Sequence, residues 1–241
     1  GKNALTANTS GASNVAVGSG ALADNTTASN CTAIGLSALN VNTTGGSNHA
    51  IGNNALDANT TGGSNVAIGS FALSTNTTAS NNTAIGQSAL ELNSTGANNV
   101  AVGSGALDAN TTANGNCAFG YNALTDNTTG VDCVAIGRAA LANNTTANNN
   151  TALGAGGLEL NTTGTENTAL GYATLYANTT ASNNTAVGSQ ALTANTTGTQ
   201  NVAVGAFALD ANTTASNNTA LGYFALSENT TGQNNVAIGP N

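Results

Sequence analysis

The sequence is poor in charge, and this scarcity limits the partners it can have. Charged residues make up 5% of the 241 residues, against roughly a quarter in typical globular proteins. The only cations are Lys2 and Arg138, and the formal net charge is −8. Two cations cannot form a phosphate-binding surface, so we expect no nucleic-acid partner. The chain also has one proline and neither methionine nor tryptophan.

Long hydrophobic segments are missing as well. No run of 18 apolar residues occurs, so no membrane insertion is predicted. No signal peptide is found, and the absence of an initiator methionine is typical of a processed chain or a segment of a longer one. Intrinsic disorder combines low hydrophobicity with high net charge, whereas this chain is 39% hydrophobic with few charges of either sign.

What the sequence has instead is a tandem repeat. Glycine recurs every 17 residues from Gly1 to Gly239, without insertions, and divides the chain into fourteen units. Counting this glycine as position 1, leucine fills position 5, asparagine position 8 and alanine position 16 in every unit. Position 17 is always apolar. We expect residues 1–241 to form a single repeat domain.

The pattern within a unit favours extended chain over helix. Apolar positions do not recur at helical spacing, and asparagine, threonine and glycine are poor helix formers. Positions 14–17 alternate with a period of two, which predicts a short strand, and positions 3–6 predict a second one. Glycine at positions 1 and 11 is predicted to form corners with positive φ.

One unit alone buries too little apolar surface to offset the conformational entropy of ordering it, so the units must stack. The sequence therefore predicts an all-β fold, a parallel β-solenoid (β-roll or β-helix) of fourteen 17-residue coils. At about 4.8 Å per coil this gives a rod of roughly 67 Å. Position 11 alternates loosely between alanine and glycine, so a 34-residue coil is the alternative.

Identical residues in stacked coils are expected to form ladders. The asparagine at position 8 is predicted to point inward, where its amide bonds to the next coil and to turn backbone groups. The threonines at positions 9 and 10 are predicted to shape and satisfy the turn. The predicted ladder residues include Asn8, Asn25, Asn42, Asn59, Asn76 and Asn110, and Leu5, Leu22, Leu39, Leu56 and Leu73.

The position-8 asparagines also begin an N-x-[ST] sequon in every unit. Glycosylation leaves the middle residue of a sequon free, yet position 9 is always threonine or serine. Sugars about 4.8 Å apart would also be crowded, which favours the inward ladder. The better candidates for glycosylation are the additional sequons that begin at Asn81, Asn149, Asn183 and Asn217.

No residue constellation in the sequence points to catalysis, and we predict no enzyme activity, no cofactor and no metal site. Eight of the ten acidic residues lie at positions 6 or 7, which predicts a solvated edge, with a weak calcium site as the alternative. The only histidine, His49, lacks the residues of a catalytic triad. Cys31 and Cys133 share position 14 at a predicted separation of roughly 29 Å, and Cys117 is at position 15, so we expect no intrachain disulfide.

Aromatic residues occupy two adjacent positions of the unit. Phenylalanine at position 3 and tyrosine at position 2 are predicted to face outward, either packed along the edge of the solenoid or in contact with a partner chain or glycan. These residues are Phe71, Phe207, Phe224, Tyr121, Tyr172 and Tyr223.

The repeat resembles known sequences. The segments NTALGYATL (167–175) and NTALGYFAL (218–226) resemble tandem repeats of bacterial surface proteins and phage tail-fibre proteins. The element VAIG at 66–69 and 134–137 is similar to the head repeat of YadA-like trimeric adhesins. This resemblance implies a left-handed parallel β-roll, side-by-side packing of three chains, and an extracellular, cell-surface or virion-surface location.

These observations together predict a non-catalytic structural rod of an extracellular fibre, stalk or adhesin shaft, which assembles with itself through stacked or side-by-side solenoids. The alternative is a receptor- or glycan-binding head that uses outward residues at positions 2, 3, 6 and 7 against a host surface. An ice-binding solenoid is a minor alternative, because position 15 interrupts the threonine rows that such proteins need.

Overall fold

The computed structural model describes residues 1–240, which contain strands and turns and no helix. It follows that no helix in this range could cross a membrane. The chain divides into two compact units, Gly1–Ala118 and Phe119–Asn241. The expectation of a single domain stays a prediction.

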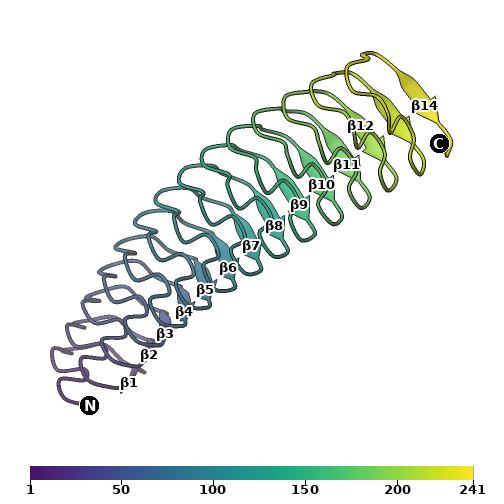
Figure 1. The fold of residues 1–241 in the computed structure, drawn as a ribbon. Coiled ribbons are helices and arrows are strands. Elements are labelled where there is room, and N and C mark those ends of the chain that lie inside the picture. The colour runs from purple at the N-terminus through teal and green to yellow at the C-terminus, as the bar shows by residue number, and fades with distance from the viewer. Residues whose placement is uncertain (241) are drawn as a thin grey trace. The chain divides into compact units, whose positions relative to one another are not determined.

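Fourteen three-residue strands recur at intervals of 17 residues (Figure 1). They are β1 (Val15–Val17), β2 (Thr32–Ile34), β3 (His49–Ile51), β4 (Val66–Ile68), β5 (Thr83–Ile85), β6 (Val100–Val102), β7 (Cys117–Phe119), β8 (Val134–Ile136), β9 (Thr151–Leu153), β10 (Thr168–Leu170), β11 (Thr185–Val187), β12 (Val202–Val204), β13 (Thr219–Leu221) and β14 (Val236–Ile238). Each strand covers positions 15–17 of a unit, so the first predicted strand is confirmed.

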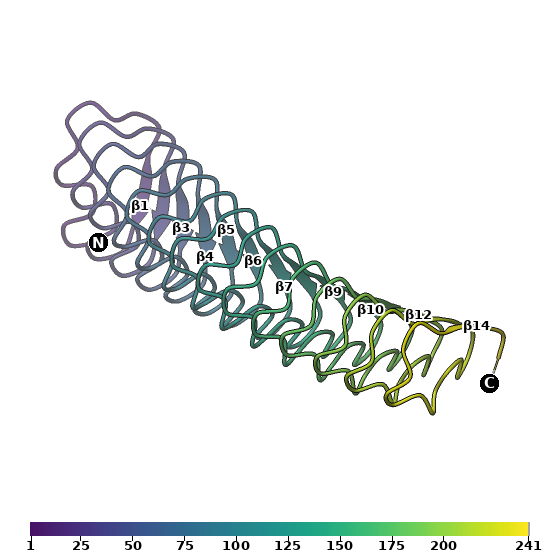
Figure 2. The same cartoon turned by 90° about the horizontal axis from the view of Figure 1, so that it is seen from above.

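Neighbouring strands pair in parallel and in strict register. In the first unit β1 to β6 pair in sequence order, with Val15 opposite Thr32. In the second unit β8 to β14 pair in the same way, with Thr168 opposite Thr185. Each residue thus lies beside its equivalent in the next repeat, and Figure 2 shows these coils from above. The parallel β-solenoid with a 17-residue coil is confirmed, and the 34-residue alternative is wrong.

The second predicted strand, at positions 3–6, is wrong: positions 2–7 form consecutive turns. The cause is a positive φ at position 3 and again at position 5, as at Phe71 (61°) and Leu73 (52°). The backbone still bonds from coil to coil there, because Phe71 N–H donates to Asn53 O at 3.0 Å and Leu73 N–H to Ala89 O at 3.1 Å. These hydrogen bonds hold the coils together where the chain is not extended.

The turn at position 5 places two successive side chains in the core. In a strand, neighbours alternate between faces, but Ala72 and Leu73 are both fully buried. The left-handed conformation of Leu73 costs about 1–2 kcal/mol. Burial of a leucine side chain contributes about 1.5–3 kcal/mol, which offsets this cost. The fully buried members of this leucine ladder are Leu22, Leu39, Leu56, Leu73, Leu90, Leu107, Leu124, Leu141, Leu158, Leu175, Leu192 and Leu209.

The two predicted glycine corners differ. Position 1 has the expected positive φ, as at Gly69 (139°). Position 11 does not, and that prediction is wrong, because Gly62 is not among the positive-φ residues. A Cβ on Gly62 would lie 2.2 Å from the carbonyl oxygen of Ala79, so this glycine permits close approach of the next coil.

Candidate functional site

The asparagine ladder predicted at position 8 is confirmed. Within each unit, the side-chain Nδ2 of one asparagine donates to the Oδ1 of the equivalent asparagine in the preceding coil. Asn59 donates to Asn42 at 2.8 Å, and Asn76 donates to Asn59 at 3.0 Å. Nδ2 of Asn59 also donates to the carbonyl oxygen of Gly62 at 2.9 Å and so closes the turn. These buried amides are bound on both sides, which leaves them unsuited to carry glycans.

The hydroxyl at position 9 explains why only threonine or serine occurs there. Thr43 Oγ1 donates to the carbonyl oxygen of Thr60 in the next coil at 3.0 Å, and Thr60 Oγ1 to that of Thr77 at 3.0 Å. Ser94 makes the same bond to Thr111 at 3.0 Å. The predicted role of the threonine pair in satisfying the turn is therefore confirmed for position 9.

A second asparagine ladder lies at position 14, which the sequence analysis placed on a face without recognising its bonding. Asn48 Oδ1 accepts the backbone N–H of Asn65 at 3.0 Å, and Asn48 Nδ2 donates to the carbonyl oxygen of Gly62 at 2.7 Å. The signal in the sequence is that position 14 is asparagine in every unit except those with Cys31 and Cys133.

The cysteines at position 14 replace members of this second ladder. The thiol of Cys31 donates to the carbonyl oxygen of Gly45 at 3.4 Å, and that of Cys133 to Ala147 at 3.4 Å. Burial raises the pKa of both thiols. Cys117, on the opposite strand face, is half-buried, and desolvation raises its thiol pKa as well. All three cysteines are thiols, as expected from their placement.

Positions 15 and 17 of the strands form an exposed surface, which we call the outer sheet face. Position 16 is buried, whereas position 17 carries large aliphatic side chains that remain exposed. Ile34, Ile51, Ile68 and Ile85 are each 37–38% exposed. No Asp, Glu, Lys or Arg occurs at either position in the chain. The sequence analysis had counted these residues toward the buried core.

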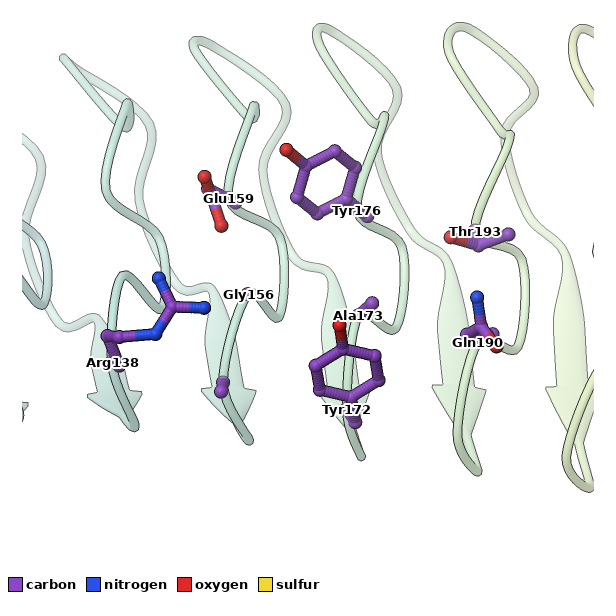
Figure 3. Close-up of a pocket in the computed structure, with 9 residues that line it drawn as sticks. Arg138, Gly156, Glu159, Tyr172, Ala173, Tyr176, Gln190 and Thr193 are labelled. Carbon is purple, nitrogen blue, oxygen red and sulfur yellow. The ribbon is translucent and has the colours of Figure 1, made fainter.

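The second unit contains a groove beside the strands, at positions 2–6 of successive coils (Figure 3). It has a volume of about 430 Å³ and is lined by Arg138, Ala155, Gly156, Glu159, Tyr172, Ala173, Tyr176, Gln190 and Thr193. In Figure 3 the guanidinium of Arg138 extends toward the coil that carries Gly156 and Glu159, and the next coil presents both tyrosine rings. The sequence analysis named Tyr172 alone among the polar residues of this groove.

The signal for the groove is a local departure from the repeat. Arg138 is the only arginine of the chain, and two of its four tyrosines are here. Position 4 is alanine in all units except two successive ones, which have Gly157 and Thr174. Thr174 is fully buried and its Oγ1 donates to the carbonyl oxygen of Gly188 at 2.8 Å.

The acidic residues do not gather into a metal site. Within residues 1–240 no group of three or more His, Cys, Asp or Glu side chains is placed to hold an ion. Partial burial raises the pKa of the Asp57 carboxyl. It does the same for Asp210, where the charge of Glu228 adds to the effect. His49 is exposed on the outer sheet face.

The aromatic residues of the last coils pack against each other. Phe207 and Phe224 stack with ring centroids 4.8 Å apart, and Tyr223 meets Phe224 edge to face at 4.4 Å. This is the edge packing expected at position 3. Tyr121 is 60% exposed and lies outside this cluster.

The four candidate glycosylation sites share an exposed place in the fold. Each lies at position 13, where φ is positive, and each side chain is exposed. They are Asn81, Asn149, Asn183 and Asn217. Their modification stays a prediction.

Comparison of the chain with protein-family models, with curated proteins and with solved structures finds no match. The function must therefore be inferred from the placement and chemistry of its residues.

Proposed function

We propose that this chain is a non-catalytic structural segment of an extracellular fibre, stalk or adhesin shaft, and that it assembles side by side with further copies of itself. The observation that carries this proposal is the outer sheet face. Parallel sheets usually have both faces covered, yet here one face presents rows of aliphatic side chains without a charged residue. Exposed apolar surfaces of this kind mark interaction sites.

The repeat itself favours a second copy as the partner. Full burial of an isoleucine contributes about 1.5–3 kcal/mol, so covering the exposed third of one side chain contributes about 0.5–1 kcal/mol. This is too little for one coil to bind a partner, but several coils in register sum to several kcal/mol. A second copy has the same spacing along its sheet, so it can meet every row at once.

Two further observations support a structural role. Every buried asparagine in the two ladders serves coil-to-coil bonding, and no buried side-chain polar atom within residues 1–240 lacks a partner. The NTALG and VAIG elements resemble repeats of bacterial surface proteins, phage tail fibres and YadA-like adhesins, which supports an extracellular, cell-surface or virion-surface location. Side-by-side packing of three chains is the form of assembly that this resemblance favours.

The assembly is tested by placing charge on the outer sheet face. In the double variant Ile51→Lys, Ile85→Lys, two cations interrupt the aliphatic row in the first unit. The matched control, Asn53→Lys with Gln87→Lys, adds the same charge at exposed residues two positions further along. Sedimentation velocity should show oligomers for the unmodified chain and the control, and monomers for the isoleucine variant, with unchanged circular dichroism. A monomeric unmodified chain at micromolar concentration would refute the assembly.

The location is tested separately. An antibody against the repeat should label intact, unpermeabilised source cells or virions in immunogold electron microscopy. Labelling that appears only after permeabilisation would contradict the extracellular role and would leave the assembly result untouched.

A further inference from the structure

We infer that the groove at Arg138, Glu159, Tyr172 and Tyr176 is a binding site for a neutral carbohydrate, a function that goes beyond the structural role proposed above. Its volume of about 430 Å³ lies within the range of small-ligand sites, about 300–1,000 Å³. All of its residues come from consecutive coils of the second unit, which hold them through coil-to-coil hydrogen bonds.

The groove offers hydrogen-bonding groups that the fold does not use. The side chains of Arg138, Glu159, Tyr172, Tyr176 and Gln190 make no hydrogen bond or ion pair to other parts of residues 1–240. Arginine supplies donors only, the carboxylate acceptors only, and the amide and phenol groups supply both. Each hydroxyl of a sugar is both donor and acceptor, so neighbouring hydroxyls match this mixed set.

The tyrosines add apolar faces to these polar groups. Tyr172 is 59% exposed and Tyr176 is half-buried beside it on the same coil. Figure 3 shows both rings at the groove with their faces open. A tyrosine ring combines a large apolar surface with a polar end. The C–H face of a pyranose can pack on such a ring while its hydroxyls reach the polar groups.

The charges favour a neutral ligand over an anion. The groove contains one cation, Arg138, and one carboxylate, Glu159, whose charges cancel. The chain carries a formal net charge of −8, which repels phosphate, nucleotides and acidic sugars.

Gly156 keeps the floor of the groove open. It lies at position 3 with a φ of 68°, and a Cβ there would come within 3.2 Å of Glu159 Oε2 and 3.6 Å of Tyr176 Cδ2. The same position in other coils accepts asparagine with positive φ, as at Asn54 (53°). Gly156→Asn is therefore compatible with the backbone and places a side chain between the carboxylate and the ring.

The binding test uses the full chain and defined probes. The neutral probes are maltotriose, cellotriose and tri-N-acetylchitotriose, and the anionic probes are inorganic phosphate and trigalacturonate. Saturation-transfer NMR detects binding, and tyrosine fluorescence gives the affinity, because tryptophan is absent and two of the four tyrosines line the groove. We expect at least one neutral trisaccharide to bind with Kd of about 1 mM or tighter.

Matched variants then locate the site. Gly156→Asn should weaken binding by about tenfold or more, and Gly105→Asn, the same change at position 3 of the first unit, should leave it within about twofold. Tyr172→Ser should weaken binding, whereas Tyr121→Ser, at a tyrosine of nearly equal exposure, should not. Unchanged circular dichroism and sedimentation in all four variants separate ligand loss from misfolding or loss of assembly.

Three results would overturn the inference: no neutral probe binds at about 10 mM, an anionic probe binds more tightly than every neutral one, or the groove variants and their controls bind equally.

Discussion

Replacing Asn59 by alanine tests whether the inner asparagine ladder stabilises the fold. Asn59 is fully buried and makes three side-chain hydrogen bonds. Two of its partners retain another bond: Gly62 O still accepts from Asn48 at 2.7 Å, and Asn76 Nδ2 still donates to Ala79 at 3.1 Å. Asn42 Oδ1 loses the one hydrogen bond it has in the ladder.

The expected cost follows from this partner count. A buried acceptor left without a donor costs about 1–3 kcal/mol, and partners that keep one bond add little. Asn59→Ala should therefore lower the free energy of unfolding by about 1–3 kcal/mol. The matched control is Asn53→Ala in the same repeat unit, because the side chain of Asn53 is exposed. A surface change of this kind is expected to stay within about 0.5 kcal/mol.

Urea unfolding followed by circular dichroism gives the comparison. Repeat proteins can unfold in parts, so hydrogen exchange of backbone amides in the coils of Asn42 and Asn76 should accompany it. Exchange should accelerate there in Asn59→Ala and remain unchanged in Asn53→Ala. If both variants unfold at the same urea concentration with the same exchange pattern, the ladder is not a source of stability and the reasoning fails.

Three further predictions concern the repeat, the core and the thiols. Deletion of residues 52–68, one whole repeat, should leave a folded chain by circular dichroism because the register of 17 is preserved, whereas deletion of residues 52–60 should disrupt it; the reverse result would contradict the coil assignment. Leu73→Ala should lower the free energy of unfolding by about 2–5 kcal/mol in urea, because it opens a cavity at a fully buried site, and a cost below about 1 kcal/mol would refute the leucine ladder. Burial raises the pKa of Cys31 and Cys133 above the usual 9.0, so their contribution to stability is complete below pH 9.0 and is lost as the pH rises through the folded pKa. Urea midpoints should thus fall above pH 9.0, and fall less in Cys31→Ala, whereas a rise would show the opposite sign.

The groove shows where sequence reasoning stopped. Arg138, Glu159 and Tyr176 come from three successive repeats, and the sequence shows only that each departs from its neighbours. Their convergence depends on the rise between coils and on Gly156 leaving the space between them. Neither quantity can be obtained from spacing along the chain.

The sequence by itself determined the repeat, the coil length and the inward asparagines. An invariant spacing of 17 residues without insertions allows only equivalent residues to stack, and an asparagine in every unit can bond to its own copies. The tertiary structure alone decided the path of positions 2–7 and the face taken by position 17. Left-handed φ values at Leu73 and its equivalents turn two neighbouring residues inward, which an alternating pattern cannot predict. The core is then filled by leucine, alanine and asparagine, so isoleucines such as Ile68 lie on the outside because the coil has no room for them within.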